Sequence, residues 1–195
     1  FLLLSCLLGP VSAEDGSRLW LRQSTDAHAQ ITTPRQSPTL NIAVRELKQA
    51  WKGLPVTLVL KKDKQLSSEG FRIRQVNGKL TVTSPSETGL LYAAYHLIRL
   101  QEMQNFGKPS ETDQEITENP AYDLRILNHW DNLDRSIERG YAGKSLWNWE
   151  ELPGTLSDRY EAYARANASI GINATVTEQC KCFLKNPFPL NIWKR

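Results

Sequence analysis

A dense group of polar and aromatic residues follows a predicted strand near the middle of the 195-residue chain. The stretch reads RILNHWDNLDRSIERGYAGKSLWNWEEL and opens on the end of that strand. Amides and carboxylates exchange hydrogen bonds with hydroxyl groups, and flat aromatic rings stack on sugar rings. Their combination is typical of a subsite for a neutral or acidic sugar. The candidate residues are Asn128, His129, Trp130, Asp131, Asn132, Glu138, Arg139, Tyr141, Trp147 and Trp149.

The polar residues of this stretch also have a structural explanation. A long loop needs internal hydrogen bonds, and a buried pair or a turn cap supplies them. This alternative competes with ligand binding for Asp131, Asn132, Glu138 and Arg139. Both readings of the four residues therefore stay open.

The tryptophans and the histidine call for separate expectations. We expect Trp147 and Trp149 to pack the loop rather than contact a ligand, because indole rings dominate core burial. His129 beside Asp131 is too small a set for a metal site, so we predict a structural or ligand hydrogen bond. Cys180-x-Cys182 is a weak metal motif without partners, and we predict no metal.

Asp131 and Glu138 are carboxylates on one loop, but we assign neither to catalysis. Glycoside hydrolysis requires two carboxylates, one acting as acid and the other as base or nucleophile. In a barrel such a pair usually comes from different strands. The sequence therefore yields candidate binding residues and no catalytic residue.

The elements that position this loop form a predicted strand, helix, strand series. The strand YDLRIL precedes the loop, and a helix capped by Ser157 and ended by Gly171 follows it. The strand INATV comes next. This order is the βαβ unit of a parallel sheet, whose active sites lie at the carboxyl ends of the strands.

The first half of the chain predicts a separate α/β layer. Leu40, Val44, Leu47 and Trp51 recur at helical spacing, and PVTLVL is rich in strand formers. FRIRQV and KLTVTS alternate around Asn77-Gly78, which predicts a tight hairpin. A second amphipathic helix begins after Ser86.

We therefore predict an α/β fold with two parts. Residues 14–103 form a small α/β sandwich domain, 104–120 a linker, and 121–176 the first βαβ unit of a truncated TIM (β/α)8 barrel. A complete barrel needs about 200 to 250 residues. The tail at 177–195 follows neither period, and we expect it to be aberrant or frame-shifted.

Composition and the first residues limit the class of protein. The formal charge is +3 with no basic stripe, which argues against nucleic acid as a partner. Residues 1–13, FLLLSCLLGPVSA, resemble part of a signal peptide and are too short to span a bilayer. We expect a secreted or periplasmic protein with no membrane partner. Lipid attachment at Cys6 is the weaker alternative.

The residues from Glu14 to Val176 resemble glycoside hydrolase family 67, the microbial α-glucuronidases. The similarity lies in NPAYDLRILNHWDNLDRSIERGYAGKSLWNWEELP and RYEAYARANASIGINATV, which look like the start of the catalytic domain. GFRIRQVNGKLTVTSPSETGLLYAAYHLIRL looks like the small domain before the barrel, which hexosaminidases share. The N-terminal part alone is much less specific.

This resemblance implies an inverting, cofactor-free hydrolase that releases (4-O-methyl-)glucuronic acid from xylo-oligosaccharides derived from glucuronoxylan. Its parent is expected to form a homodimer. The residues at or near the uronate pocket would be Trp130, Asp131, Asn132, Glu138, Arg139 and Trp147. The family's catalytic carboxylates lie on later barrel strands, so we expect this chain to be an inactive N-terminal fragment. Two alternatives stay open: a non-catalytic carbohydrate-binding protein, and a β-hexosaminidase-like glycosidase.

Overall fold

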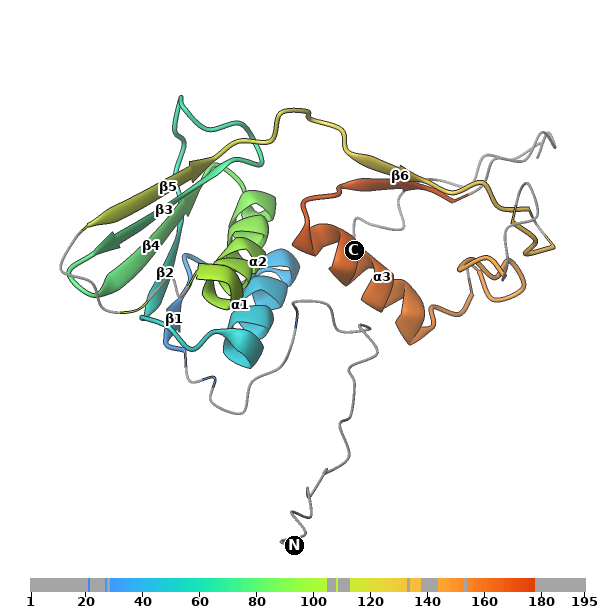
Figure 1. Ribbon diagram of the computed structural model, residues 1–195, viewed down its shortest axis with the longest axis horizontal. Helices are drawn as coiled ribbons and strands as arrows, with labels where there is room; N and C mark the ends of the chain where they lie inside the picture. The colour runs from blue at the N-terminus through green and yellow to red at the C-terminus, as the bar shows by residue number, and fades with distance from the viewer. Residues whose placement is uncertain are drawn as a thin grey trace, which may run out of the picture.

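A five-stranded mixed sheet and two helices form the first part of the molecule (Figure 1). The computed structural model describes Leu21, Ala27, Lys108 and residues 29–104, 113–132, 134–137, 144–152 and 154–177. The sheet has the order β1-β2-β4-β3-β5. Its strands are β1 (Ile31–Thr32), β2 (Val56–Leu60), β3 (Phe71–Val76), β4 (Lys79–Ser84) and β5 (Gln114–Glu118).

The sheet mixes parallel and antiparallel pairs. Strands β1, β2 and β4 run parallel, while β3 lies antiparallel to both β4 and β5. The β3–β4 connection is the predicted hairpin, in which Asn77 and Gly78 have φ values of 48° and 70°. Glycine and asparagine tolerate this left-handed region, so the Asn-Gly prediction is confirmed.

Helices α1 (Pro38–Ala50) and α2 (Glu87–Gln104) pack side by side against one face of the sheet (Figure 1). Ser37 caps α1, since its Oγ accepts a hydrogen bond from the Leu40 amide at 3.2 Å. Ser86 caps α2 in the same way through the Gly89 amide at 3.0 Å. Both predicted helices are confirmed. Their apolar faces and the inner face of the sheet form the core around Leu40, Leu47, Trp51, Ile73, Leu80, Val82, Leu90, Leu97 and Ile98.

The predicted linker at 104–120 was wrong for residues 114–118. Strand β5 pairs there with β3 over five residues, from Phe71↔Glu118 to Gln75↔Gln114. Glu and Thr dominate its sequence because the strand lies at the sheet edge and four of its five residues are exposed. Only Ile116 turns toward the core, opposite Ile73. An edge strand of this kind lacks the apolar alternation on which the sequence reading depended.

A βαβ unit forms the second part, as predicted. Strand β6 (Ile126–Asn128), helix α3 (Asp158–Ser169) and β7 (Ala174–Val176) follow in order, and the two strands pair in parallel. Ser157 stands at the cap position of α3, although its hydroxyl accepts no cap hydrogen bond. Gly171 has a φ of 78° just beyond the helix, which explains the glycine. Within the described residues this unit is a two-stranded sheet, and a barrel stays a prediction.

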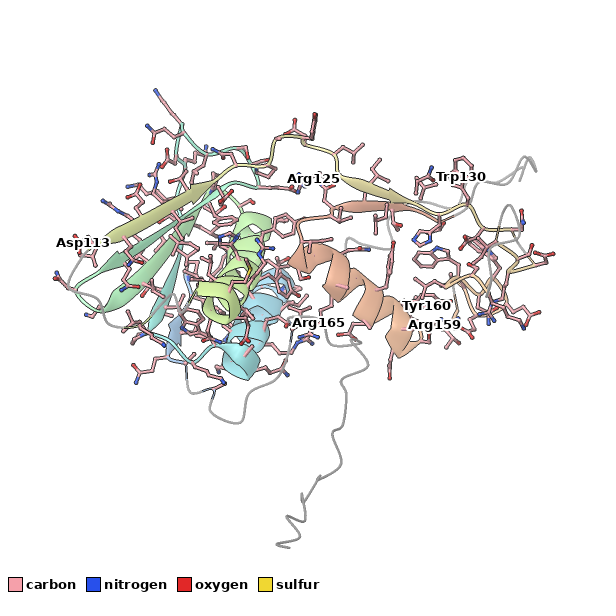
Figure 2. The ribbon with its side chains drawn as sticks, in the orientation of Figure 1. Asp113, Arg125, Trp130, Arg159, Tyr160 and Arg165 are labelled. Atoms are coloured by element: carbon pink, nitrogen blue, oxygen red, sulfur yellow. The ribbon has the colours of Figure 1, made fainter. Side chains whose placement is uncertain are left out.

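Charged contacts attach the βαβ unit to the first part. Arg165 of α3 donates to both carboxylate oxygens of Glu46 on α1, at 2.8 and 2.7 Å. Arg125, just before β6, pairs with Glu69 and also donates to the Gly171 carbonyl. Figure 2 shows Arg125 near the start of β6 and Arg165 on the α3 side that faces α1. The described helices include none long and apolar enough to cross a membrane.

Candidate functional site

The candidate site is a loop at the carboxyl ends of β6 and β7, which we call the rim loop, residues 129–157. It leaves β6 at His129, whose amide donates to the Val176 carbonyl at 3.0 Å and so continues the parallel ladder. Trp130 therefore stands at the end of the two-stranded sheet, remote from the first part of the molecule (Figure 2). This is the edge at which parallel α/β folds place their ligands.

Trp147 fills the interior of the rim loop. Its indole is 3% exposed and stacks on Tyr160 with ring centroids 5.5 Å apart and an interplanar angle of 8°. His129 and Tyr163 present their rings edge-on at 5.6 and 5.4 Å. Aromatic pairs prefer these offset and edge geometries. Trp147 thus packs the loop against α3, as the structural alternative predicted.

Asp131 is also buried and has an internal partner. Its side chain is almost inaccessible, and its Oδ2 accepts a hydrogen bond from the Ser145 hydroxyl at 2.5 Å. The Ser145 Oγ accepts in turn from the backbone amide of Trp147 at 2.9 Å. The carboxylate therefore joins the start of the rim loop to its later part, a role the sequence reading left open for Asp131.

Trp130 and Asn132 remain accessible on the rim. Trp130 is 39% exposed, and Asn132 is exposed on the turn that follows. The Asn132 amide Nδ2 donates to Ser136 Oγ at 2.9 Å, and Arg135 closes the turn with a φ of 71°. The carbonyl oxygen of the Asn132 side chain can accept from a ligand. An exposed indole face beside an amide can stack on a sugar ring and bond its hydroxyls.

The end of the rim loop is tied to the first turn of α3. The Tyr160 hydroxyl accepts from the Asn148 amide at 2.9 Å, and Arg159 pairs with Glu151 at 3.0 Å. Hydrogen bonding to Tyr160, together with the Glu151 charge, raises the pKa of Arg159. Both ends of the loop thus rest on the same βαβ unit.

The structure brings together four of the six residues predicted for the site: Trp130, Asp131, Asn132 and Trp147. Glu138 and Arg139 lie outside the described residues, as does Tyr141. Sequence reasoning missed Ser145, Tyr160 and Tyr163. The two tyrosines stand three apart on α3, a spacing that places both on one helix face.

The described residues contain no cluster of three or more metal-ligating side chains. Asp134 is an exposed carboxylate whose pKa is lowered mainly by hydrogen bonds from the Ser136 hydroxyl and amide. The described rim loop therefore offers stacking and hydrogen-bonding groups.

Comparison with known proteins places the rim loop inside a recognised domain. Residues 105–184 match the glycosyl hydrolase family 67 middle domain. Alpha-glucuronidase A from Aspergillus tubingensis is 31% identical over 212 residues, which cover 90% of this chain and 25% of that protein. The chain is a relative of the family 67 α-glucuronidases.

Two further similarities concern a second curated relative and a solved structure. A probable alpha-glucuronidase A from Aspergillus niger is also 31% identical, with the same coverage of 90% and 25%. The chain thus spans about a quarter of the length of these curated relatives. A GH138 enzyme targeting pectin rhamnogalacturonan II has a related fold, with a TM-score of 0.53, 16% identity, and coverage of 76% of this chain and 18% of the enzyme.

Proposed function

We propose that this chain supplies the N-terminal domain and the first rim loop of an inverting α-glucuronidase. The enzyme would release (4-O-methyl-)glucuronic acid from xylo-oligosaccharides during xylan breakdown, outside the cytoplasm and without a cofactor. The observation that carries the proposal is the exposed Trp130–Asn132 corner at the carboxyl end of β6, within the segment that matches the family 67 middle domain. A homodimer of the full-length enzyme is part of the same proposal.

The geometry divides the proposed site residues into two groups. Trp130 would stack on the sugar, and Asn132 would bond a hydroxyl through its side-chain carbonyl oxygen. Asp131 and Trp147 would hold the loop from within, because both are buried against Ser145 and α3. Glu138 and Arg139 stay proposed as neighbours of the uronate.

Hydrolysis would require groups from further strands. A glycosidase needs two carboxylates on opposite sides of the scissile bond. In the described rim loop, the carboxylates of Asp131, Asp134 and Glu151 are all engaged by neighbouring side chains. We therefore expect the 195-residue chain alone to release no uronic acid.

A chimera tests the proposed function. Residues 29–177 would replace the matching segment of the Aspergillus tubingensis alpha-glucuronidase A, and release of glucuronic acid from aldouronic oligosaccharides would be measured. We expect an active chimera. Trp130→Ala should lower its kcat/KM by about tenfold, since a lost aromatic contact costs about 1 kcal/mol beyond the buried area.

Met103→Ala is the matched control, because Met103 is 69% exposed on α2 and far from the rim loop in sequence. It should leave kcat/KM unchanged. A folded but inactive chimera, or equal activity of the Trp130→Ala and Met103→Ala chimeras, would contradict the proposal.

A further inference from the structure

Three side chains from three elements form a continuous hydrogen-bonded chain behind the rim. Thr175 Oγ1 of β7 lies 3.1 Å from the Leu127 carbonyl of β6. The Tyr163 hydroxyl of α3 lies 3.1 Å from Thr175 Oγ1 and 2.6 Å from His129 Nε2. The imidazole at the root of the rim loop is therefore connected to both neighbouring elements.

The hydrogens of this chain can be assigned by elimination. A carbonyl oxygen only accepts, so Thr175 uses its single hydroxyl hydrogen on Leu127. Thr175 Oγ1 must then accept from Tyr163, which uses the hydrogen of that hydroxyl. The Tyr163 oxygen has lone pairs left, and the 2.6 Å contact is a hydrogen bond only if His129 Nε2 carries the hydrogen.

The other ring nitrogen faces Asp131. His129 Nδ1 lies 3.9 Å from Asp131 Oδ2, too far for a hydrogen bond. That oxygen is already occupied by the Ser145 hydroxyl at 2.5 Å. The Trp147 and His129 rings are in edge contact, with their centroids 5.6 Å apart. Asp131 thus does not hold the imidazole hydrogen on Nδ1.

We propose that His129 is a positioning residue of the rim, held by Tyr163 and Thr175 in the tautomer that carries its hydrogen on Nε2. We call these two hydrogen bonds of the Tyr163 hydroxyl, to His129 and to Thr175, the tautomer lock. The lock fixes the backbone at the end of β6 and thereby positions the next residue, Trp130. The role of this positioning in sugar binding rests on the proposed function, whereas the tautomer of His129 does not.

The tautomer is measured by ¹⁵N NMR of imidazole rings in the 195-residue chain at about pH 8, where imidazole is in general uncharged. The sequence has three histidines, so assignment is practical. We expect the Nε2–H pattern for His129. An Nδ1–H pattern in the unmodified chain would overturn the proposal without any variant.

Thr175→Val and Thr175→Ser test the hydrogen bonds that connect Thr175 through Tyr163 to the His129 ring. Valine removes the acceptor of the Tyr163 hydrogen, which then turns to His129 Nε2 and shifts the tautomer to Nδ1–H. Serine restores the hydroxyl and should restore the Nε2–H pattern. A valine variant that keeps the original tautomer would contradict the lock.

His96 is an internal control in the same spectrum. Arg99 Nη2 lies 2.7 Å from His96 Nδ1 and can only donate, so His96 carries its hydrogen on Nε2 in every variant. A changed tautomer of His96 in the Thr175→Val variant would show general loss of structure. The tautomers of His129 in Thr175→Ser and in the unmodified chain would then test the proposal.

The positioning role of His129 is tested by measuring KM and kcat of the chimera described above. Tyr163→Phe should raise KM by about three- to tenfold, as for one lost hydrogen bond, and change kcat little. Equal KM with and without the substitution would overturn the positioning role. An inactive unmodified chimera with the Nε2–H tautomer intact would count against the proposed function and leave the lock standing.

Discussion

Asp131 and Trp147 show, at the scale of single residues, that residue type does not fix the role. Both were candidates for ligand contact because of their chemistry, and both are buried in the structure. Trp130 has the same indole ring and Asn132 a similar polar group, but both remain accessible. The difference arises from partners: Asp131 is buried against Ser145, and Trp147 is stacked on Tyr160.

Ser145→Ala is expected to lower the free energy of unfolding of the rim loop. The substitution leaves the buried Asp131 carboxylate without the hydroxyl donor that reaches it at 2.5 Å. An unsatisfied buried group costs about 1–3 kcal/mol, more if charged. Hydrogen exchange at the Trp147 amide, which donates to Ser145 Oγ, measures the loss.

Ser136→Ala is the control for this prediction. Ser136 lies on the same loop and bonds the exposed Asp134, so its loss should cost less. Equal exchange rates at Trp147 in the two variants would contradict the role assigned to the Asp131–Ser145 bond.

His96 predicts a pH dependence of stability. Burial, and then the Arg99 charge, lower the pKa of His96 from 6.5 to about 4. The unfolded chain binds the proton first, so the free energy of unfolding should fall as the pH drops from about 6.5 to about 4. Urea unfolding at several pH values should show a smaller fall for His96→Gln. Parallel pH profiles for the two proteins would exclude this residue as the cause.

Helix α3 is the element that joins the two parts of the molecule. Its Arg165 meets Glu46, which is 1% exposed, and the Glu46 hydrogen bonds raise the pKa of Arg165 further. A second pair, Arg45 with Glu161, links the same two helices but is exposed at both ends. Because the Arg165–Glu46 pair is more buried, breaking it should lower the free energy of unfolding more than breaking the Arg45–Glu161 pair.

Arg165→Met should therefore destabilise the chain by about 3–5 kcal/mol, because Glu46 stays buried without the guanidinium that donates to both of its oxygens. The double substitution Glu46→Met with Arg165→Met should recover most of the loss. Chemical unfolding of the two single variants and the double variant measures the cycle.

Glu161→Ala breaks the exposed Arg45–Glu161 pair and is the matched control, with an expected cost of about 0–1 kcal/mol. A loss for Arg165→Met no larger than that of Glu161→Ala would show that the buried pair does not hold α3 in place.

At the scale of the whole molecule, the two parts differ in how well they bury apolar surface. The first part has a continuous core between its sheet and two helices. In the second, Tyr122, Leu124 and Ile126 alternate along the chain and are all exposed, with Val176 exposed on β7. A parallel sheet normally has both faces covered, so this row is the surface that further strands or helices would bury.

We expect the amides of β6 and β7 to exchange hydrogen sooner than those of β3 and β4. Local opening requires little energy where few apolar contacts break. Hydrogen–deuterium exchange followed by mass spectrometry compares the two sheets within one sample. Equal protection of both sheets would mean that the βαβ unit is stable without further cover.

The sequence by itself determined the features that depend on neighbouring residues. Asn77-Gly78 fixed the hairpin through backbone freedom, apolar spacing fixed α1 and α2, and the strand, helix, strand order gave the βαβ unit. The motif after β6 also placed the candidate residues Trp130 and Asn132 just beyond the carboxyl end of that strand. These are local effects of backbone geometry and periodicity.

Only the tertiary structure decided which distant groups meet. It put Glu115 and Thr117 into an edge strand, paired Glu46 with Arg165 across 119 positions, and joined Asp131 to Ser145. Edge pairing relies on backbone hydrogen bonds that any sequence can make, and the burial of a polar side chain depends on a partner whose approach the folded chain alone determines.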